Sequence, residues 1–401
     1  MLSNRWPIWP TSGSSAICPD ACSDACSDAC SGSASPNVSR TSFLRTVIKY
    51  LGSKRRLVPV LTQMLVRSGA RTALDLFTGT TRVAQAFKSA GALVTAVDST
   101  FYAETLAGCY VSTDANAVDT EALAAATAEL DALPGAPGYF TETFCRRSRF
   151  FQPANGARVD AVRCEIERKY RGHPFEPILL TSLMEAADRV DSTTGVQMAY
   201  VKEWAERSYR PLELRVPHLL SGSGRHLRGD ACELVCDLGE FDLAYLDPPY
   251  NQHRYEANYH IWETLVAWDS PEHYGVACKR AELRSRPRSL FNSRRTIGGA
   301  IAKVVRDVRA EVVILSYNDE SWVTLEELVE ICLARGHVQV LEFESDRYVG
   351  ARIGIYNNVG KRVGSVGRLR NVEYVLVAGE RATVRRIVEP WTRGRGALVA
   401  S

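Results

Sequence analysis

The tetrapeptide Asp247-Pro248-Pro249-Tyr250 joins a carboxylate, two prolines and an aromatic ring. Proline lacks a backbone donor and fixes φ, so a strand cannot continue through this stiff turn. The Asp247 carboxylate and the Pro248 carbonyl can accept hydrogen bonds, and the Tyr250 ring can stack. These groups suit a planar amine, whose two N–H groups would be accepted while its ring is stacked.

The turn follows the apolar run 241–246, which predicts a buried strand that ends at Asp247. In open α/β sheets, ligands bind at the carboxyl ends of the strands. We therefore expect Asp247 to lie at a ligand-binding edge.

A second group of polar residues follows an earlier strand. The run 72–77 predicts a strand, and 82–90 and 92–97 predict a helix and a second, parallel strand. The turn after the first strand contains Gly79 and Thr80, and a small residue there lets the backbone approach a ligand. Asp98 ends the second strand, where an acid can accept two ribose hydroxyls. The pair predicts a nucleoside site, and the alternative is a tight turn with a helix-capping aspartate.

A third candidate segment, Tyr50-Leu51-Gly52-Ser53-Lys54, precedes a helix predicted over 56–68. Gly52 could permit a close approach, and Lys54 could reach a carboxylate. The alternative is a basic loop.

The remaining chain predicts one doubly wound α/β sheet with a mostly helical insertion. We expect a catalytic domain over 41–101 and 225–380, the insertion over 102–224 and a basic tail over 381–401. Helices are expected in the insertion at 119–133, 157–170, 176–190 and 195–208. Later strands are expected at 311–316, 338–343 and 372–377, and later helices at 258–268, 296–308 and 323–335.

Residues 1–40 are of low complexity, with Asp-Ala-Cys-Ser repeated from Asp20. The four-residue period could place cysteines along one side of a helix as a soft-metal site; a disordered tail is the favoured alternative. The other cysteines lack paired CxxC spacing, which suits a reducing cytosol. His253 and His260 have no third ligand at suitable spacing, so we expect no metal.

Charge is local rather than global. The net charge is only +3, but 279–309 holds ten Lys or Arg against two acids, and 146–171 holds eight against three. A third basic run, 361–401, holds nine against three. Together these runs favour a polyanionic partner over solvated helix faces. No apolar run is long enough to span a membrane, and the N-terminus does not resemble a signal peptide.

Taken together, these motifs resemble the DNA adenine-N6 methyltransferases whose cofactor motifs precede an Asp-Pro-Pro-Tyr motif. The resemblance covers about 49–380. It rests on Tyr50-Leu-Gly-Ser-Lys54, Asp75-Leu-Phe-Thr-Gly79, Asp98 and Asp247-Pro-Pro-Tyr250, with weaker similarity at Asn258-Tyr-His, 289–294, 315–319 and Glu373-Tyr374.

The resemblance implies methyl transfer from S-adenosylmethionine (SAM) to adenine N6 in double-stranded DNA, after the base flips out. It implies catalytic roles for Asp247, Pro248, Pro249 and Tyr250. The implied cofactor residues are Tyr50, Gly52, Lys54, Asp75, Phe77, Gly79, Thr80, Asp98 and Asp230. The candidate DNA-binding residues are Arg146, Arg147, Arg149, Lys169, Arg286, Arg288, Arg294 and Arg295. We expect a monomer in a prokaryotic cytoplasm, with a cognate restriction endonuclease as a candidate partner.

One position departs from the family pattern, because Thr81 replaces the second glycine of Phe-x-Gly-x-Gly. Threonine is unfavourable there if the position needs positive φ and harmless if it only begins the helix. Two alternatives to adenine methylation therefore stay open. One is methyl transfer to another amine, in cytosine N4, RNA or protein. The other is a DNA-binding protein that has lost SAM affinity.

Overall fold

The computed structural model describes residues 48–400 except 51, 53, 194, 202, 253, 347–354, 357–361, 365–369 and 393–398. The cysteine repeat, the expected low-complexity segment 1–40 and His253 lie outside the described residues.

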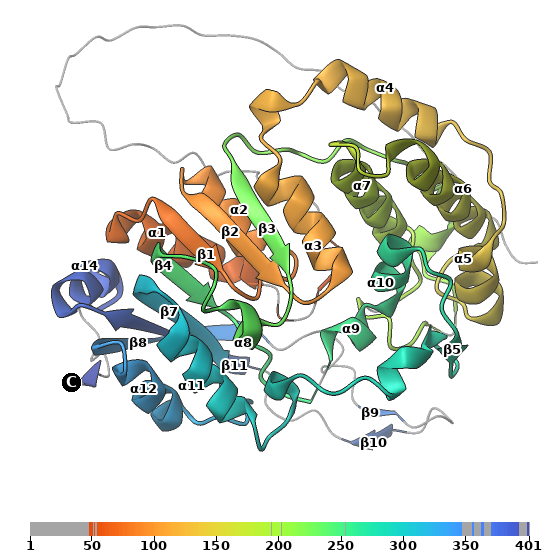
Figure 1. Ribbon diagram of the computed structural model, residues 1–401. Helices are drawn as coiled ribbons and strands as arrows, with labels where there is room; N and C mark the ends of the chain where they lie inside the picture. The colour runs from red at the N-terminus through yellow and green to blue at the C-terminus, as the bar shows by residue number, and fades with distance from the viewer. Residues whose placement is uncertain are drawn as a thin grey trace, which may run out of the picture. The chain divides into compact units, whose positions relative to one another are not determined.

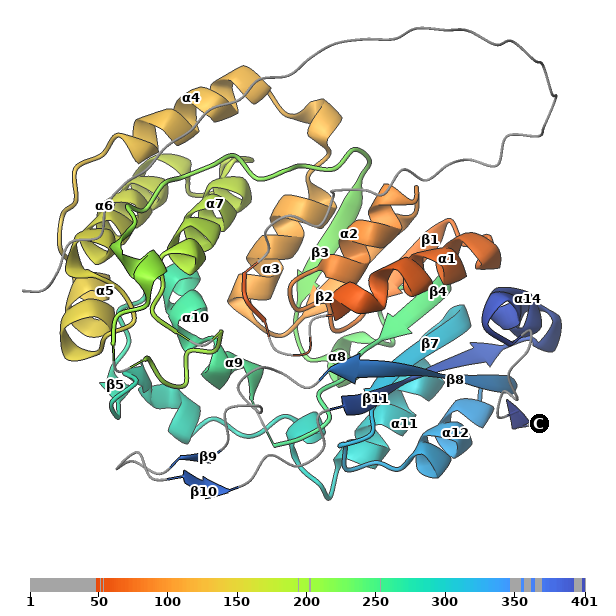
Figure 2. The same ribbon diagram turned by 180° about the vertical axis from the view of Figure 1, so that it is seen from behind.

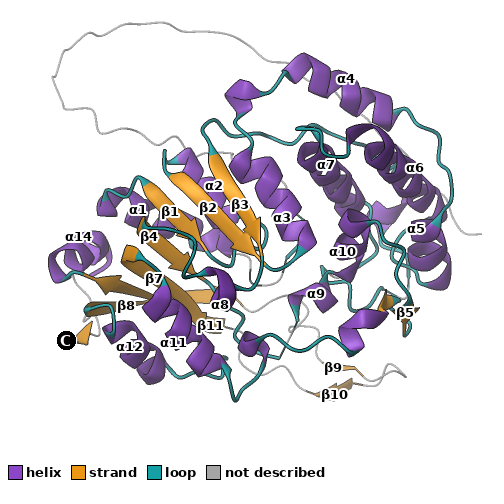
Figure 3. Ribbon diagram, viewed as in Figure 1, coloured by secondary structure: helices purple, strands orange, loops and turns teal. Residues whose placement is uncertain are grey.

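The core of the described chain is one eight-stranded sheet, with the order β12-β8-β11-β7-β4-β1-β2-β3 (Figures 1 and 3). The strands are β1 (Thr72–Asp75), β2 (Leu93–Asp98), β3 (Gly224–Arg228), β4 (Phe241–Leu246), β7 (Ala310–Asn318), β8 (His337–Asp346), β11 (Arg370–Gly379) and β12 (Val399–Ala400). The five strands from β3 to β7 are parallel, and β11 pairs antiparallel with both β7 and β8. The expected doubly wound sheet is confirmed.

The strand order reverses between β1 and β4, which pair with each other although β2 and β3 lie between them in the sequence. Such a reversal opens a crevice at the carboxyl ends of the strands, where ligands of this fold class bind. Asp75 ends β1, and Asp247 follows β4 directly.

Helices cover both faces of the sheet because successive strand side chains point to opposite sides. Ala73 packs with one layer and Leu74 with the other. The first layer contains α1 (Val58–Ser68), α2 (Arg82–Ser89) and α14 (Arg381–Thr392), which face the viewer in Figure 2. The second contains α8 (Ala231–Leu234), α11 (Ile297–Asp307) and α12 (Leu325–Leu333), which face the viewer in Figure 1.

A separate core is built from helices beside the β3 edge of the sheet (Figure 1). These helices are α3 (Phe101–Ala107), α4 (Thr120–Asp131), α5 (Tyr139–Thr141), α6 (Pro153–Tyr170), α7 (Glu176–Arg189), α9 (Tyr255–Asn258) and α10 (His260–Ala267). Tyr259, Ile261 and Trp262 of the α9–α10 segment are buried in this core. The chain just after the Asp247 turn therefore connects the sheet to the helical region. Two short hairpins follow, β5–β6 (His273–Tyr274, Lys279–Arg280) and β9–β10 (Ile355–Tyr356, Arg362–Gly364).

The prediction of a helix over 195–208 is wrong. Its described residues form bends and turns, with one 3-10 turn at Glu206–Tyr209. The backbone here is tied to other segments, because Gln197 N donates to Asn258 O at 2.8 Å and Val201 N donates to Ser192 O at 3.1 Å. These long-range bonds replace the local bonds that a helix would need.

Strand β3 and helix α14 also differ from the sequence expectation. Strand β3 was not predicted, since its Gly-Arg-His-Leu-Arg sequence is polar and none of its residues is fully buried. Residues 381–392, expected in a basic tail, form α14, whose Val384, Ile387 and Val388 are buried against the sheet layer. In the part of the chain that is described, no helix is long and apolar enough to cross a membrane.

Candidate active site

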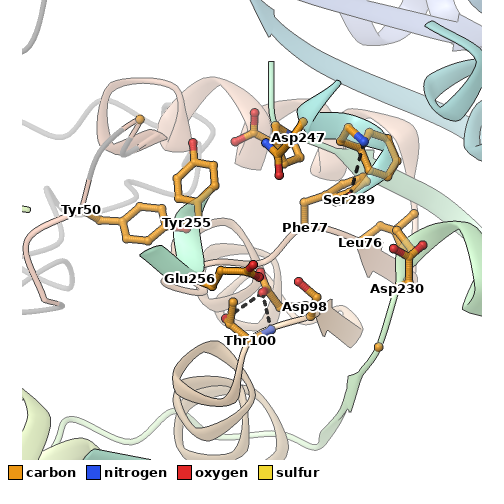
Figure 4. A pocket seen from close by; sticks show the side chains of 17 residues that line it. Tyr50, Leu76, Phe77, Asp98, Thr100, Asp230, Asp247, Tyr255, Glu256 and Ser289 are labelled. Atoms are coloured by element: carbon orange, nitrogen blue, oxygen red, sulfur yellow. Dashed lines mark hydrogen bonds between the residues drawn. The ribbon is translucent and has the colours of Figure 1, made fainter. Parts of the chain in front are cut away.

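A pocket opens at the carboxyl edge of β1, β2 and β4, where Asp98 and Asp247 lie at opposite ends (Figure 4). Its volume is about 800 Å³ including the space open to solvent. Tyr50, Tyr255 and Glu256 lie on one side in Figure 4, and Leu76, Phe77 and Asp230 on the other. A smaller adjoining pocket reaches the turn after β1 and shares Tyr50, Gly52, Phe77 and Asp247.

Asp247 lines both pockets and pairs with Lys54, which also contacts a second carboxylate. The Lys54 ammonium is 3.0 Å from Asp247 Oδ1 and also contacts Glu373 of β11. Burial raises the pKa of Asp247 to about 6, Lys54 opposes this rise and Glu373 adds to it. Burial disfavours the Lys54 ammonium, but Asp247 and Glu373 outweigh it and hold the pKa of Lys54 well above its usual value. Asp247 is therefore mainly a carboxylate at neutral pH.

The rest of the Asp247 turn is fixed by packing. Pro248 is buried, and Pro249 lines the larger pocket. The Tyr250 ring meets Tyr317 of β7 edge-on, with centroids 6.4 Å apart, and the Trp322 amide donates to the Tyr250 carbonyl at 3.4 Å. The turn is thus held from both β4 and β7.

The turn after β1 surrounds Asp75 with neutral donors. Asp75 Oδ2 accepts from Thr78 Oγ1 at 3.0 Å and from Ala84 N at 3.2 Å, while Oδ1 is buried with no partner among the described residues. Burial raises the pKa of Asp75 to about 7. Gly79 has φ +49°, and a Cβ there would lie 3.1 Å from Tyr50 Oη. A side chain at position 79 would meet both backbone strain and crowding.

Thr81, which stands where the family pattern has glycine, adopts a positive φ of +60°. This position does require the left-handed region, which is unfavourable for a β-branched residue. The Thr81 side chain is fully buried, donates to Thr80 O at 2.7 Å and accepts from Gln85 Nε2 at 2.8 Å. Thr81 lines neither pocket. The loop therefore keeps a glycine-like conformation while the extra side chain points into the protein.

Asp98 links the second strand to the turn after the first. Its Oδ2 accepts from Gly79 N at 2.9 Å, and its Oδ1 accepts from Thr100 N and Oγ1 at 3.0 and 2.8 Å. The Ser99 amide also bonds this carboxylate, which lines the larger pocket. Asp230 caps α8 by accepting from Cys232 N at 2.8 Å, and also lines the pocket.

Tyr50 closes one side of the pocket as part of an aromatic stack. Its ring lies between those of Tyr255 and Tyr259, with centroid distances of 5.3 and 4.7 Å and interplanar angles of 16° in both cases. Gly52 has φ +73°, and a Cβ there would be 3.5 Å from Tyr255 Oη. The N-terminal motif is therefore anchored by the segment that follows Asp247.

The sequence-predicted basic residues lie in two different settings. Arg286, Arg288, Arg294 and Arg295 are exposed, and among the described residues no acid pairs with any of them. Their segment also contributes Ser289, Phe291 and Asn292 to the pocket wall.

The basic residues of the helical region are instead engaged by neighbours. Lys169 contacts both Glu129 carboxylate oxygens at 2.5 and 2.7 Å, and Arg146 pairs with Glu142 at 3.2 Å. Arg147 Nη1 lies 3.3 Å from His273 Nε2, and the guanidinium carbon of Arg149 lies 4.8 Å from the centre of the Trp204 ring. These four residues do not line either pocket.

The structure adds residues that the sequence interpretation did not assign to the site, chiefly Glu373, Tyr255, Glu256 and Phe291. Glu373 lies in a segment whose family similarity was noted, but its contact with Lys54 spans 319 residues of sequence. Phe291 packs edge-on against Phe77, with centroids 5.1 Å apart. In the described ranges, no group of three His, Cys, Asp or Glu is arranged to hold a metal ion.

The chain is similar in sequence to known methyltransferases. The chain is 28% identical over 316 residues to the type II methyltransferase M.NlaIII of Neisseria lactamica, covering 75% of this chain and 92% of that protein. It is 26% identical over 310 residues to the type II methyltransferase M.FokI of Planomicrobium okeanokoites, covering 72% of this chain and 47% of that protein. Among solved structures, a precorrin-6y C5,15-methyltransferase from Geobacter metallireducens aligns over 84% of this chain and 94% of its own. Its TM-score of 0.29 and sequence identity of 11% are too low to support a conclusion about fold or function.

The family model of the D12 class N6 adenine-specific DNA methyltransferases matches residues 50–331. This range runs from the Tyr50 motif through the turn after β1 and the Asp247 turn. The chain belongs to the D12 class of N6 adenine-specific DNA methyltransferases.

Proposed function

We propose that this protein transfers a methyl group from SAM to N6 of a flipped adenine in double-stranded DNA, at a defined sequence. The observation that carries this proposal is the position of Asp247. A carboxylate held by Lys54 lies at one end of a pocket whose other end contains Asp98. An amine acceptor and a nucleoside site thus share one sheet edge.

The residues present fit SAM on three observations. The buried Asp75 Oδ1 has no partner in the described part of the chain. Gly52 and Gly79 line the smaller pocket, and the Asp98 carboxylate lines the larger one. We propose that Asp98 accepts a ribose hydroxyl and that Phe77, Phe291 and Asp230 surround the base. The turn over Thr78–Thr80, with Tyr50 and Lys54, would lie beside the amino-acid part. When bound, SAM supplies a methyl group activated by the neighbouring sulfonium.

The contribution of the catalytic turn is to orient the target amine. The N6 lone pair of adenine is delocalised into the ring, which makes it a weak nucleophile. Hydrogen bonds from both N6–H groups to Asp247 and the Pro248 carbonyl would favour a lone pair directed at the methyl group. Holding the reactants in this geometry can supply a large share of the rate enhancement.

The target base must leave the duplex to reach this edge, at a cost of a few kcal/mol. We propose that Tyr250, fixed edge-on by Tyr317, stacks on the flipped base. The exposed Arg286, Arg288, Arg294 and Arg295 would hold phosphates beside the pocket, because their segment forms part of its wall. Arg146, Arg147 and Arg149 would make further contacts from the helical region, and Lys169 contributes less because Glu129 already neutralises it.

We further propose a cytoplasmic, monomeric protein in a prokaryotic cell. The names of its relatives, which include modification methylases, favour pairing with a restriction endonuclease of the same sequence specificity.

Methyl transfer from tritiated SAM to duplex DNA tests the proposal. The purified chain should label DNA, and the label should be recovered as N6-methyladenine after digestion. Label in N4-methylcytosine, in RNA or in protein would support the other-amine alternative. Calorimetric titration with SAM provides the second arm, since no binding at high micromolar SAM would support the alternative of a DNA-binding protein without activity.

A further inference from the structure

Three charged side chains from distant parts of the chain meet beside the Asp247 turn. Lys54 lies between the Asp247 and Glu373 carboxylates, and the Lys54 and Glu373 side chains are only 11% and 12% exposed. Ser316 of β7 donates to Glu373 Oε1 at 3.0 Å. Glu373 is therefore fixed by β7 and its own strand β11, and it fixes Lys54 in turn.

The charges of this trio matter because methyl transfer moves positive charge onto the amine. The N6 lone pair forms the new N–C bond, the electrons of the broken C–S bond stay with sulfur, and the methylated amine then gives one proton to Asp247 or solvent. A carboxylate near N6 stabilises the developing charge, whereas a lysine ammonium opposes it. Such interactions are strong at a site that excludes water.

Glu373 makes the net charge of this trio negative rather than neutral. With both carboxylates ionised and Lys54 protonated, the trio carries one net negative charge. Without Glu373, Lys54 and Asp247 would form a neutral pair. The Lys54 ammonium would then have Asp247, the proposed acceptor of N6–H, as its ion-pair partner, with no second carboxylate to offset its charge.

Resting on the function proposed above, we propose that Glu373 is a positioning residue for methyl transfer. It binds Lys54, offsets the lysine charge and keeps an Asp247 acceptor available to the target amine. Glu373 itself does not touch the base, so its effect passes through Lys54 and Asp247.

The pH dependence of the reaction separates this role from a purely structural one. The negative charge of Glu373 raises the pKa of Asp247, so its removal should lower that pKa and move the acid limb of activity to lower pH. The other ionisable groups that interact with Asp247 are Lys54, Asp75, Tyr245, Tyr250, Tyr255 and Tyr317. Only Asp75, whose pKa burial raises to about 7, titrates near the same range.

The test compares the wild type with Glu373→Gln, which removes the charge but keeps an acceptor for Lys54. Glu342→Gln is the matched control, since Glu342 is exposed on the neighbouring strand β8 opposite Tyr374. The readouts are kcat, KM for SAM and for DNA, and the pH profile of kcat/KM. We expect Glu373→Gln to lower kcat about 100-fold, with both KM values within about threefold and the acid limb moved to lower pH. The control should match the wild type.

A loss of kcat without a moved acid limb, a moved limb without a loss of kcat, or no change would each overturn the inference. If Glu373→Gln lacks a cooperative melting transition, Glu373→Asp decides. It keeps the charge on a shorter arm, so it should lower kcat by about tenfold with an unmoved limb, and wild-type kcat would overturn the inference. A wild-type protein that fails to methylate DNA overturns the proposed function as well, whereas an active wild type confines any failure to Glu373.

Discussion

Asp75 ends β1 and Asp247 directly follows the neighbouring parallel strand β4, yet their surroundings differ. Asp75 is buried among neutral donors, one of its oxygens has no partner in the described chain, and burial raises its pKa to about 7. Asp247 contacts a lysine and lines both pockets. The same residue type at the same sheet edge thus has two environments. Asp75 accepts hydrogen bonds from Thr78 and Ala84, whereas Asp247 pairs with a lysine.

The largest effect is expected from a change at Asp247, the residue that pairs with a lysine. Asp247→Ala removes the acceptor for N6–H, so kcat should fall by about 10³-fold or more, while SAM and DNA affinities change little. Filter-binding of tritiated product measures the rate, and calorimetry measures SAM binding. The exposed Asp237 provides the control variant Asp237→Asn. Methyl transfer by Asp247→Ala above about a tenth of the wild-type rate would remove Asp247 from the mechanism.

A change in the loop after β1 should act on SAM binding rather than on the chemical step. Gly79→Ala places a Cβ 3.1 Å from Tyr50 Oη at a residue with φ +49°. Left-handed backbone costs a non-glycine residue about 1–2 kcal/mol, so the SAM dissociation constant should rise about tenfold. A rise in KM for SAM at constant kcat would fit this assignment. A loss of kcat alone would mean that the two aspartate sites are less separate than described.

The protonation of Asp247 gives a test without mutation. The proposed mechanism requires its carboxylate form, and burial raises its pKa to about 6, so kcat/KM for DNA at saturating SAM should fall as pH drops through about 6. Below that point the expected slope is about tenfold per pH unit. A pH profile from 4.5 to 8.5, corrected for the fraction of folded protein, measures it. An acid limb near 4 would place the titrating group outside this buried environment.

The basic residues repeat the contrast between an available and an occupied charge. Arg288→Ala removes an exposed cation beside the pocket, whereas Lys169→Ala removes one already paired with Glu129. Arg288→Ala should weaken DNA binding and lower the slope of log K against log salt by about 1. Lys169→Ala should leave both nearly unchanged. Equal losses in a fluorescence anisotropy titration over several salt concentrations would show that pairing in the free protein does not predict DNA contact.

The smallest effect is expected at Thr81, two residues from Gly79. Thr81→Gly relieves a left-handed threonine but removes the Oγ1 that accepts from Gln85 Nε2, and Thr81 lines neither pocket. Strain and hydrogen bond are each worth about 1 kcal/mol, so they nearly cancel. SAM affinity should stay within about threefold of the wild type. A gain of tenfold or more would indicate that Thr81 limits cofactor binding after all.

The sequence predicts those parts of the site that local patterns determine. The apolar run 241–246 followed by two prolines predicted β4 and its end, and the alternation of apolar and polar segments predicted the doubly wound sheet. Local patterns do not reveal contacts such as Lys54–Glu373, which join residues 319 positions apart.

Where the sequence expectation failed, tertiary contacts override local preference. Residues 195–208 have a helical composition, but their backbone groups bond to Asn258 and Ser192. The sequence of α14 is rich in arginine, so its three buried aliphatic residues do not stand out as a helix face. Strand β3 lacks the apolar alternation that predicts a strand. The φ of Thr81 could not be derived from composition, because both a left-handed turn and a helix start were compatible with threonine.

The central claim, that Asp247 directs methyl transfer to adenine N6, is tested most directly in DNA from cells that express the chain. Sequencing that detects N6-methyladenine and N4-methylcytosine should find methylated adenine in one recurring sequence with the wild type. It should find none with Asp247→Ala expressed at the same level. Methylation of cytosine instead, or adenine methylation that persists in the Asp247→Ala cells, would contradict the account.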